Sequence, residues 1–153
     1  MSFVASASGV IHASRTDCFS RLRDFSTWRD WMPPSFRPVR GPRRDLAVGD
    51  RFFVRIAPTK RALPLFIGLK LVRLAVGREI TWAGGIPGVL EGEHAFLFDD
   101  AEGEPGATLV RSEEVWSGAI ASVNFAAAKI REAASTVGRH QIDGLAAAVE
   151  KRT

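Results

Sequence analysis

Between residues 51 and 116 the sequence repeats one pattern, in which short runs with a period of two are separated by glycine and proline. A period of two places alternate side chains on the same face of a β-strand. In the three clearest runs the side chains expected on one face belong to Phe52, Val54 and Ile56, to Ile80 and Trp82, and to His94, Phe96 and Phe98. No helical period intervenes, and strands that follow one another directly pair antiparallel. This part of the chain therefore predicts an antiparallel sheet.

Breaks between the predicted strands fall at Gly84-Gly85, at Pro87-Gly88 and between residues 99 and 106, because glycine and proline end strands readily. The longest apolar run covers residues 62–76 and is interrupted by Lys70 and Arg73. It is shorter than the ~20 residues that a membrane-spanning helix needs. We therefore expect a buried strand there.

The sequence before residue 51 predicts one strand and two short helices. Residues 3–13 alternate small and apolar side chains, which is typical of a strand. Asp17 is expected to cap a helix over residues 18–25, because its carboxylate can accept a backbone N–H two or three residues later. A second helical turn over residues 28–31 should stop at Pro33-Pro34, where the N–H donor that a helix needs is missing.

Residues 122–151 predict a long helix whose sheet-facing side carries small residues. The stripe at helical spacing consists of Val123, Ala127, Ile130, Ala134, Val137, Gln141 and Leu145, and the opposite side carries Glu132, Arg139, Asp143 and Glu150. Gly138 and Gly144 each lower helix propensity by about 1 kcal/mol relative to alanine, which permits a bend. Because alanine recurs on the stripe, the helix either packs very close to the sheet or leaves space there.

The chain of 153 residues has the size of one domain, so we expect a single domain over residues 1–153. With 46% hydrophobic and 25% charged residues, the composition argues against a disordered or fibrous chain. Cys18 is the only cysteine, which excludes an intrachain disulfide and suits a reducing cytoplasm. The first residues lack the basic and then apolar segments of a secretory signal. We therefore expect a cytoplasmic protein without a transmembrane segment.

The net charge of +4 is unevenly distributed along the chain. Residues 37–61 are strongly basic, whereas residues 91–114 are strongly acidic. A basic surface could attract an anionic ligand, a membrane or a nucleic acid, but a solvated sheet face explains the same pattern and is the interpretation we favour. No nucleic-acid-binding signature accompanies the basic stretch, so we expect no nucleic acid partner.

Short motifs distributed over nearly the whole chain resemble those of the SRPBCC superfamily, which includes START-like lipid carriers and polyketide cyclases and dehydratases. The motifs are Ile11-His12-Ala13, Cys18-Phe19, Leu22, Asp24, Trp28, Trp31 and Pro33, then Ile80-x-Trp82-x-Gly84, Gly92-x-His94-x-Phe96-x-Phe98, Gly106-x-Thr108 and Glu114-x-Trp116-x-Gly118. The resemblance departs at Ser14, where members often carry proline. It implies an α+β helix-grip fold, in which a curved antiparallel sheet wraps around a long C-terminal helix and two short helices follow the first strand. It also implies a ligand cavity between sheet and helix.

If the even-numbered faces of the later strands point into this cavity, they place three polar side chains among apolar ones: His94, Ser112 and Glu114. The two strands should form a hairpin through residues 99–106. Keeping both even-numbered faces inward places His94 opposite Ser112 or, after a two-residue shift, opposite Glu114. The Cβ atoms of His94 and Glu114 would then lie about 4.5 to 8 Å apart.

Burial favours the neutral form of a carboxyl group, whereas a protonated imidazole beside it favours the charged form. Glu114 and His94 could therefore titrate as a coupled unit and transfer a proton, which makes them the candidate catalytic residues. Two structural alternatives stay open. The pair could be a buried hydrogen bond that only fixes the strands, or Glu114 could pair with an arginine.

The residues expected to contact a ligand are Trp82, Phe96, Phe98, Ser112, Trp116 and Trp31. Aromatic residues at strand spacing also form packed cores, so a purely structural role is the alternative for them. Trp28 and Trp31 could pack the short helices against the sheet or gate the entrance. His12 is expected in solvent and His140 on the flank of the long helix, so the separated histidines predict no metal site.

Two functions are consistent with these residues. The first is a binding module for a small hydrophobic or aromatic ligand, a lipid or a polyketide-like compound, that needs no cofactor. The second is an enzyme of the polyketide cyclase or dehydratase type that uses Glu114 and His94 for proton transfer. The chain contains no tyrosine, which removes one common phenolic acid from the second function. The sequence leaves a homodimer open.

Overall fold

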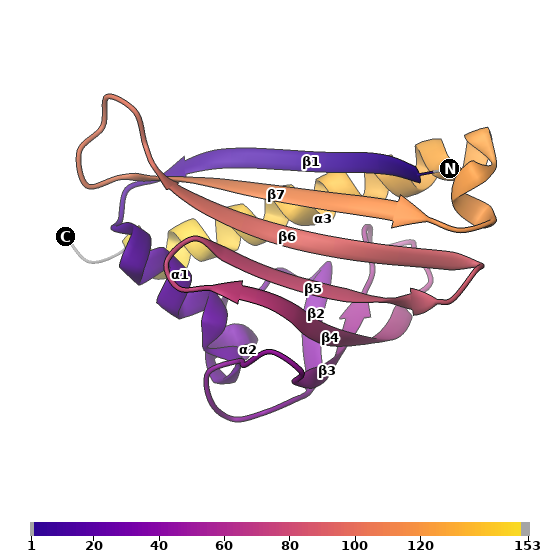
Figure 1. The fold of residues 1–153 in the computed structure, drawn as a ribbon, viewed down its shortest axis with the longest axis horizontal. Coiled ribbons are helices and arrows are strands. Elements are labelled where there is room, and N and C mark those ends of the chain that lie inside the picture. Colours follow the sequence, from indigo (N-terminus) through magenta and orange to yellow (C-terminus); the bar gives the residue numbers. More distant parts are fainter. Residues whose placement is uncertain (1, 151–153) are drawn as a thin grey trace.

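The computed structural model describes residues 2–150, which form an α+β fold in which an antiparallel sheet curves around one long helix (Figure 1). The strands are β1 (Ser2–Ile11), β2 (Phe36–Arg40), β3 (Arg51–Ile56), β4 (Leu65–Ala75), β5 (Glu79–Ile86), β6 (Leu90–Asp100) and β7 (Thr108–Ser117). The helices are α1 (Arg15–Arg23), η1 (Phe25–Thr27), α2 (Trp28–Trp31), η2 (Ile120–Ser122) and α3 (Asn124–Glu150). The strand order is β1-β7-β6-β5-β4-β3-β2. The predicted helix-grip fold is confirmed.

The even-numbered residues of β3, β5, β6 and β7 face inward, as their period of two predicted, whereas in β4 the odd-numbered Leu69 and Leu71 do so. Buried side chains on this face include Phe52, Val54, Ile80, Trp82, Phe96, Phe98 and Val110. Strands β6 and β7 pair so that His94 lies opposite Glu114. Of the two registers that the sequence allowed, the structure therefore has the shifted one.

Helix α3 packs closely against the sheet and against α2 along its C-terminal half. A Cβ atom at Gly138 would lie 2.7 Å from the Ser112 Oγ, and one at Gly144 would lie 2.5 Å from the Trp31 carbonyl oxygen. The helix can approach this closely because these two positions lack a side chain. Toward its N-terminus, Ala133 and Ala134 instead face a cavity. The alternatives of close packing and free space thus both apply, each to a different part of the helix.

The predicted start of the long helix needs correction. Val123 precedes α3 and is exposed, so the sheet-facing stripe does not begin there. Farther along the helix, the stripe residues Ala127, Val137 and Leu145 are buried as expected. The predicted last residue, Lys151, lies outside the described residues.

Ser14, and not Asp17, caps the first helix. The Ser14 hydroxyl accepts the backbone N–H of Asp17 at 3.1 Å, so α1 begins at Arg15, three residues earlier than predicted. Serine caps a helix as well as aspartate does, and here it comes first in the chain. The acidic Asp17 lies in the first turn, where its charge is favourable near the helix N-terminus. The helical turn at Trp28–Trp31 is confirmed.

The prediction of a buried strand over residues 62–76 is wrong for its first part. Strand β4 begins at Leu65, and its Leu69 and Leu71 side chains are buried. Leu65 and Phe66 are exposed, because Leu65 lies at one end of the cavity and Phe66 belongs to the other face of the sheet. Between residues 2 and 150 no helix has the length and apolar character needed to cross a membrane.

Candidate functional site

A cavity of about 220 Å³ lies between the inner face of the sheet and the N-terminal half of α3. The strands contribute mainly apolar and aromatic side chains, namely Phe36, Ile56, Leu65, Ile67, Leu69, Trp82, Leu90 and Trp116. Helix α3 adds Ile130, Ala133, Ala134 and Val137, and the loop between β3 and β4 adds Pro58 and Leu63. Leu63 is 92% exposed and so marks the mouth of the cavity.

His94 and Glu114 form a buried polar pair in the wall of this cavity. Their side chains come from neighbouring positions on β6 and β7, and the imidazole Nδ1 lies 2.9 Å from the Glu114 Oε1. The two residues are 5% and 8% exposed, respectively. The second ring nitrogen, Nε2, lies 2.7 Å from the Ser112 Oγ. The second carboxylate oxygen, Oε2, accepts the indole N–H of Trp116 at 2.9 Å.

Among these hydrogen bonds, the one from Trp116 has a direction that is fixed by the chemistry of its groups. An indole N–H only donates, so the Glu114 carboxylate must accept from Trp116. With Glu114 as a carboxylate, the remaining contacts are satisfied either by a neutral His94, which donates from Nδ1 to Glu114 and accepts the Ser112 hydroxyl proton at Nε2, or by a protonated His94, which donates from both nitrogens. Glu114 is then a carboxylate held by two donors in an apolar wall. Such a group can accept a proton from a molecule in the cavity.

The structure brings four of the predicted site residues to the cavity wall: His94, Glu114, Trp82 and Trp116. The partners of Glu114 are His94 and Trp116, and not the arginine that the sequence left open. Ser112 lies farther from the cavity, between His94 and Gly138 of α3. It can therefore orient the imidazole without facing a ligand.

The other predicted contacts do not line the cavity. The Phe96 ring packs 5.4 Å from the Trp82 ring, and the Phe98 ring packs 5.8 Å from the Phe19 ring, as ring centroids. The indole N–H of Trp31 donates to the Thr27 hydroxyl at 3.0 Å, and its carbonyl lies against Gly144. Trp28, whose indole N–H donates to the Leu22 carbonyl oxygen, is fully buried.

Part of the cavity wall was not predicted from the sequence. The loop residues Pro58 and Leu63 belong to no periodic run, so no pattern assigned them to a face. The helix residues Ile130 and Ala134 were on the predicted sheet-facing stripe, and the repeated alanine was the signal for space beside them.

Cys18 is not a candidate nucleophile, although it is the only cysteine. Burial raises the pKa of its thiol to about 11. The thiolate is the reactive form, so this side chain stays protonated and inert at neutral pH. His12 is exposed as predicted, and His140 contacts the Ser35 hydroxyl at 3.1 Å. Within the described part of the chain, no three His, Cys, Asp or Glu side chains come together as metal ligands.

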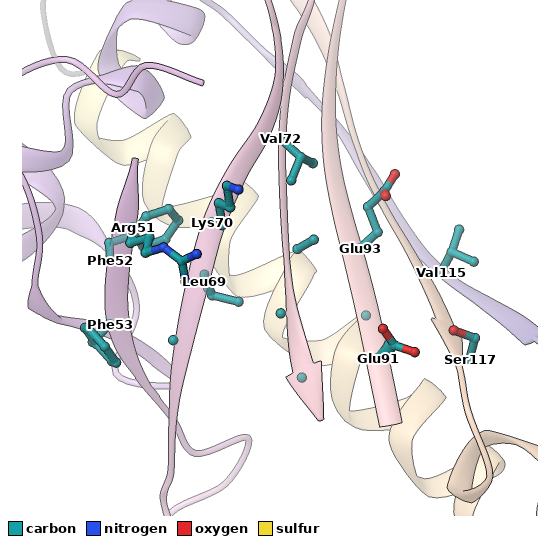
Figure 2. A pocket seen from close by; sticks show the side chains of 15 residues that line it. Arg51, Phe52, Phe53, Leu69, Lys70, Val72, Glu91, Glu93, Val115 and Ser117 are labelled. Atoms are coloured by element: carbon teal, nitrogen blue, oxygen red, sulfur yellow. The ribbon is translucent and has the colours of Figure 1, made fainter. Parts of the chain in front are cut away.

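A second and wider hollow, of about 800 Å³, lies on the outer face of the sheet (Figure 2). Figure 2 shows Arg51 and Lys70 on one side of it and Glu91 and Glu93 on the other. Its floor includes the backbone of glycines in β4, β5 and β6. Arg51 of the basic stretch and Lys70 thus face Glu91 and Glu93 of the acidic stretch across an open surface. We regard the inner cavity as the candidate site, because it combines apolar walls with a few convergent buried polar groups.

No protein-family model matches the sequence, and no curated protein matches it either. Among solved structures, the di-domain ARO/CYC StfQ from the steffimycin biosynthetic pathway superimposes with a TM-score of 0.77 at 13% identity, covering 99% of this chain and 52% of StfQ. The di-domain ARO/CYC BexL from the BE-7585A biosynthetic pathway gives a TM-score of 0.76 at 18% identity, covering 99% of this chain and 51% of BexL. The chain therefore has the helix-grip fold.

Single-domain helix-grip structures superimpose as well. Protein MLL2253 from Mesorhizobium loti gives a TM-score of 0.70 at 13% identity and covers 99% of both chains. The present helix-grip chain therefore spans about half the length of StfQ and BexL and nearly all of MLL2253. At these identities the comparison concerns the fold alone. The function of the present chain therefore has to be argued from the residues of its own cavity.

Proposed function

We propose that the protein binds a small hydrophobic or aromatic molecule, lipid-like or polyketide-like, in the cavity between the sheet and α3. The observation that carries this proposal is an apolar cavity whose buried polar wall groups are the mutually bonded His94 and Glu114. Aliphatic walls supply affinity through burial of apolar surface, and the few polar groups orient the ligand.

The size of the cavity limits the part of the ligand that it can enclose. An apolar cavity of about 150 Å³ suffices to take up benzene, whereas sites for drug-sized ligands have volumes of about 300–1,000 Å³. The volume of about 220 Å³ therefore suits one or two aromatic rings or a short acyl segment. A longer molecule would extend past Leu63 at the mouth, where the apolar surface continues to the exposed Leu65.

Replacing Ala134 with phenylalanine tests this proposal. The uncharged fluorescent probe N-phenyl-1-naphthylamine would place its two-ring naphthyl group in the cavity and its phenyl ring at the mouth. The new phenylalanine ring would occupy the cavity from α3, so the affinity for this probe should fall at least tenfold. The wild-type protein should bind this probe saturably at about one site. Fluorescence titration measures both quantities, with circular dichroism to verify that each protein is folded.

The matched control is Ala147→Phe, because Ala147 is also in α3 but is exposed. This variant should bind the probe as the wild type does. If folded wild-type protein does not bind the probe, or if Ala134→Phe binds it unchanged, the inner cavity is not a ligand site.

A second candidate function is a reaction of the polyketide cyclase or dehydratase type. The observation that favours it is the position of the Glu114 carboxylate in the cavity wall, held by His94 and Trp116. In a dehydration, Glu114 would accept a proton from the carbon beside a carbonyl group. It would then return this proton to the departing hydroxyl, so that water leaves and a carbon–carbon double bond forms. In this function His94 would orient the carboxylate.

A further inference from the structure

Gln141 is a buried side chain whose polar atoms have no partner. It is 1% exposed, and within residues 2–150 neither its Oε1 nor its Nε2 makes a hydrogen bond. Buried polar groups are nearly always hydrogen-bonded, and one without a partner destabilises the folded state. An amide in this condition therefore indicates a partner that is not part of the protein chain.

Gln141 lies directly beyond the inner end of the cavity and is not itself one of its lining residues. It follows Val137 by one helical turn, so both residues occupy the same side of α3 as Ala134. Side chains of a helix lean toward its N-terminus, and for Gln141 this is the direction of the cavity. The mouth at Leu63 lies at the other end of the lining.

The side-chain N–H donors in the cavity wall itself are already engaged. The indole N–H of Trp116 and the Nδ1 of His94 both contact the Glu114 carboxylate. Glu114 is an acceptor, so a ligand carbonyl group would find no donor there. The amide of Gln141 offers two N–H groups and one acceptor oxygen, all without a partner.

From this geometry we infer that Gln141 hydrogen-bonds a neutral polar group, a ketone or hydroxyl oxygen, at the buried end of an otherwise apolar ligand. The inference rests on the proposed binding function and names the ligand class: uncharged, mainly apolar molecules with an oxygen at the end that enters first. A ligand carboxylate is disfavoured because Glu114 carries the same charge in the same cavity.

The test compares acetophenone with isopropylbenzene, two probes of nearly equal shape that differ in a carbonyl group. Their affinities are measured by NMR titration for the wild type and for Gln141→Leu. Isopropylbenzene is the more hydrophobic probe, so the informative quantity is the ratio of the two affinities in each protein. We expect Gln141→Leu to reduce the relative affinity for acetophenone at least tenfold. The affinity for isopropylbenzene should stay the same or rise.

A direct readout is available because the sequence contains one glutamine and one asparagine, Gln141 and Asn124. In a ¹H–¹⁵N correlation spectrum, acetophenone should shift the side-chain NH₂ signals of Gln141 more than isopropylbenzene does. Asn124, exposed at the start of α3, is the internal reference and should not move. Gln141→Leu should also raise the Tm, by roughly 2–4 °C, because it removes a buried amide without a partner.

The outcomes separate this inference from the binding function on which it rests. If both probes bind the wild type, fail to bind Ala134→Phe, and keep the same affinity ratio in Gln141→Leu, the binding function stands and the role of Gln141 is refuted. A lower Tm for Gln141→Leu would likewise show that the amide already has a partner within the protein. If neither probe binds the folded wild type, the binding function and this inference fail together.

Discussion

Trp82→Ala is expected to lower the free energy of unfolding by about 3–5 kcal/mol, the usual cost of deleting a large buried aromatic side chain. Trp82 is 2% exposed and lies where the cavity wall meets the aromatic core. Its ring centroid lies 5.0 to 6.0 Å from those of Trp28, Phe36, Phe52, His94 and Phe96. The loss of this ring therefore removes contacts to five rings at once. Urea denaturation followed by circular dichroism measures the change.

The control for this substitution is Phe125→Ala. Phe125 is 74% exposed at the start of α3, so its loss should change the free energy of unfolding by less than about 0.5 kcal/mol. A loss of less than about 1 kcal/mol for Trp82→Ala would mean that this ring is not packed as described. The cavity wall would then differ from the one proposed.

Glu114→Gln and His94→Gln are expected to separate catalysis from binding. If the protein catalyses a dehydration, Glu114→Gln should lower turnover of a polyketide-like β-hydroxy ketone by about 10²–10⁴-fold, because glutamine cannot accept the proton. His94→Gln should lower turnover in the same direction, since His94 holds the carboxylate at 2.9 Å. Both variants should still bind N-phenyl-1-naphthylamine, because the apolar walls remain. Mass spectrometry of the product, which lacks one water, measures the turnover.

Glu113→Gln is the matched control, since Glu113 is the neighbour of Glu114 on β7 and lies near the exposed side chain of Arg111 instead. It should behave as the wild type. If Glu114→Gln and His94→Gln both fold and process the substrate as the wild type does, the pair is structural. Binding alone would then be the function.

The fold was predictable because it rests on local periods. Alternation in strands such as 93–98 sets which side chains face inward, whatever the rest of the chain does. Because even-numbered residues face inward on both β6 and β7, His94 could lie opposite Ser112 or Glu114. In the structure it lies opposite Glu114. A hydrogen-bonding hydroxyl at Ser14 was equally visible in the sequence. Asp17 can also cap a helix, so residue type alone does not decide where the helix begins.

The extent of the cavity was less predictable. The period of two assigns a side chain to one face of the sheet, but it does not say whether that side chain lies at the level of the cavity or beyond it. Phe96 and Phe98 share the inner face with His94, yet they lie in the core beyond the cavity. What decides the difference is how closely α3 approaches the sheet at each level, which depends on contacts such as that of Gly138 with Ser112. The loop over residues 57–64 has no period at all, so its contribution at Leu63 follows only from the tertiary structure.

The central claim is that a small apolar molecule binds on the inner side of the sheet, and intermolecular NOEs test it most directly. Protein labelled at its methyl groups would be saturated with acetophenone, and NOEs to the aromatic protons of the probe would be recorded. We predict NOEs to the methyl groups of Ile67, Ala134 and Val137, which line the inner cavity and not the outer hollow. NOEs confined to Val72 and Val115, which line the outer hollow in Figure 2, would place the probe on the other face and contradict the claim.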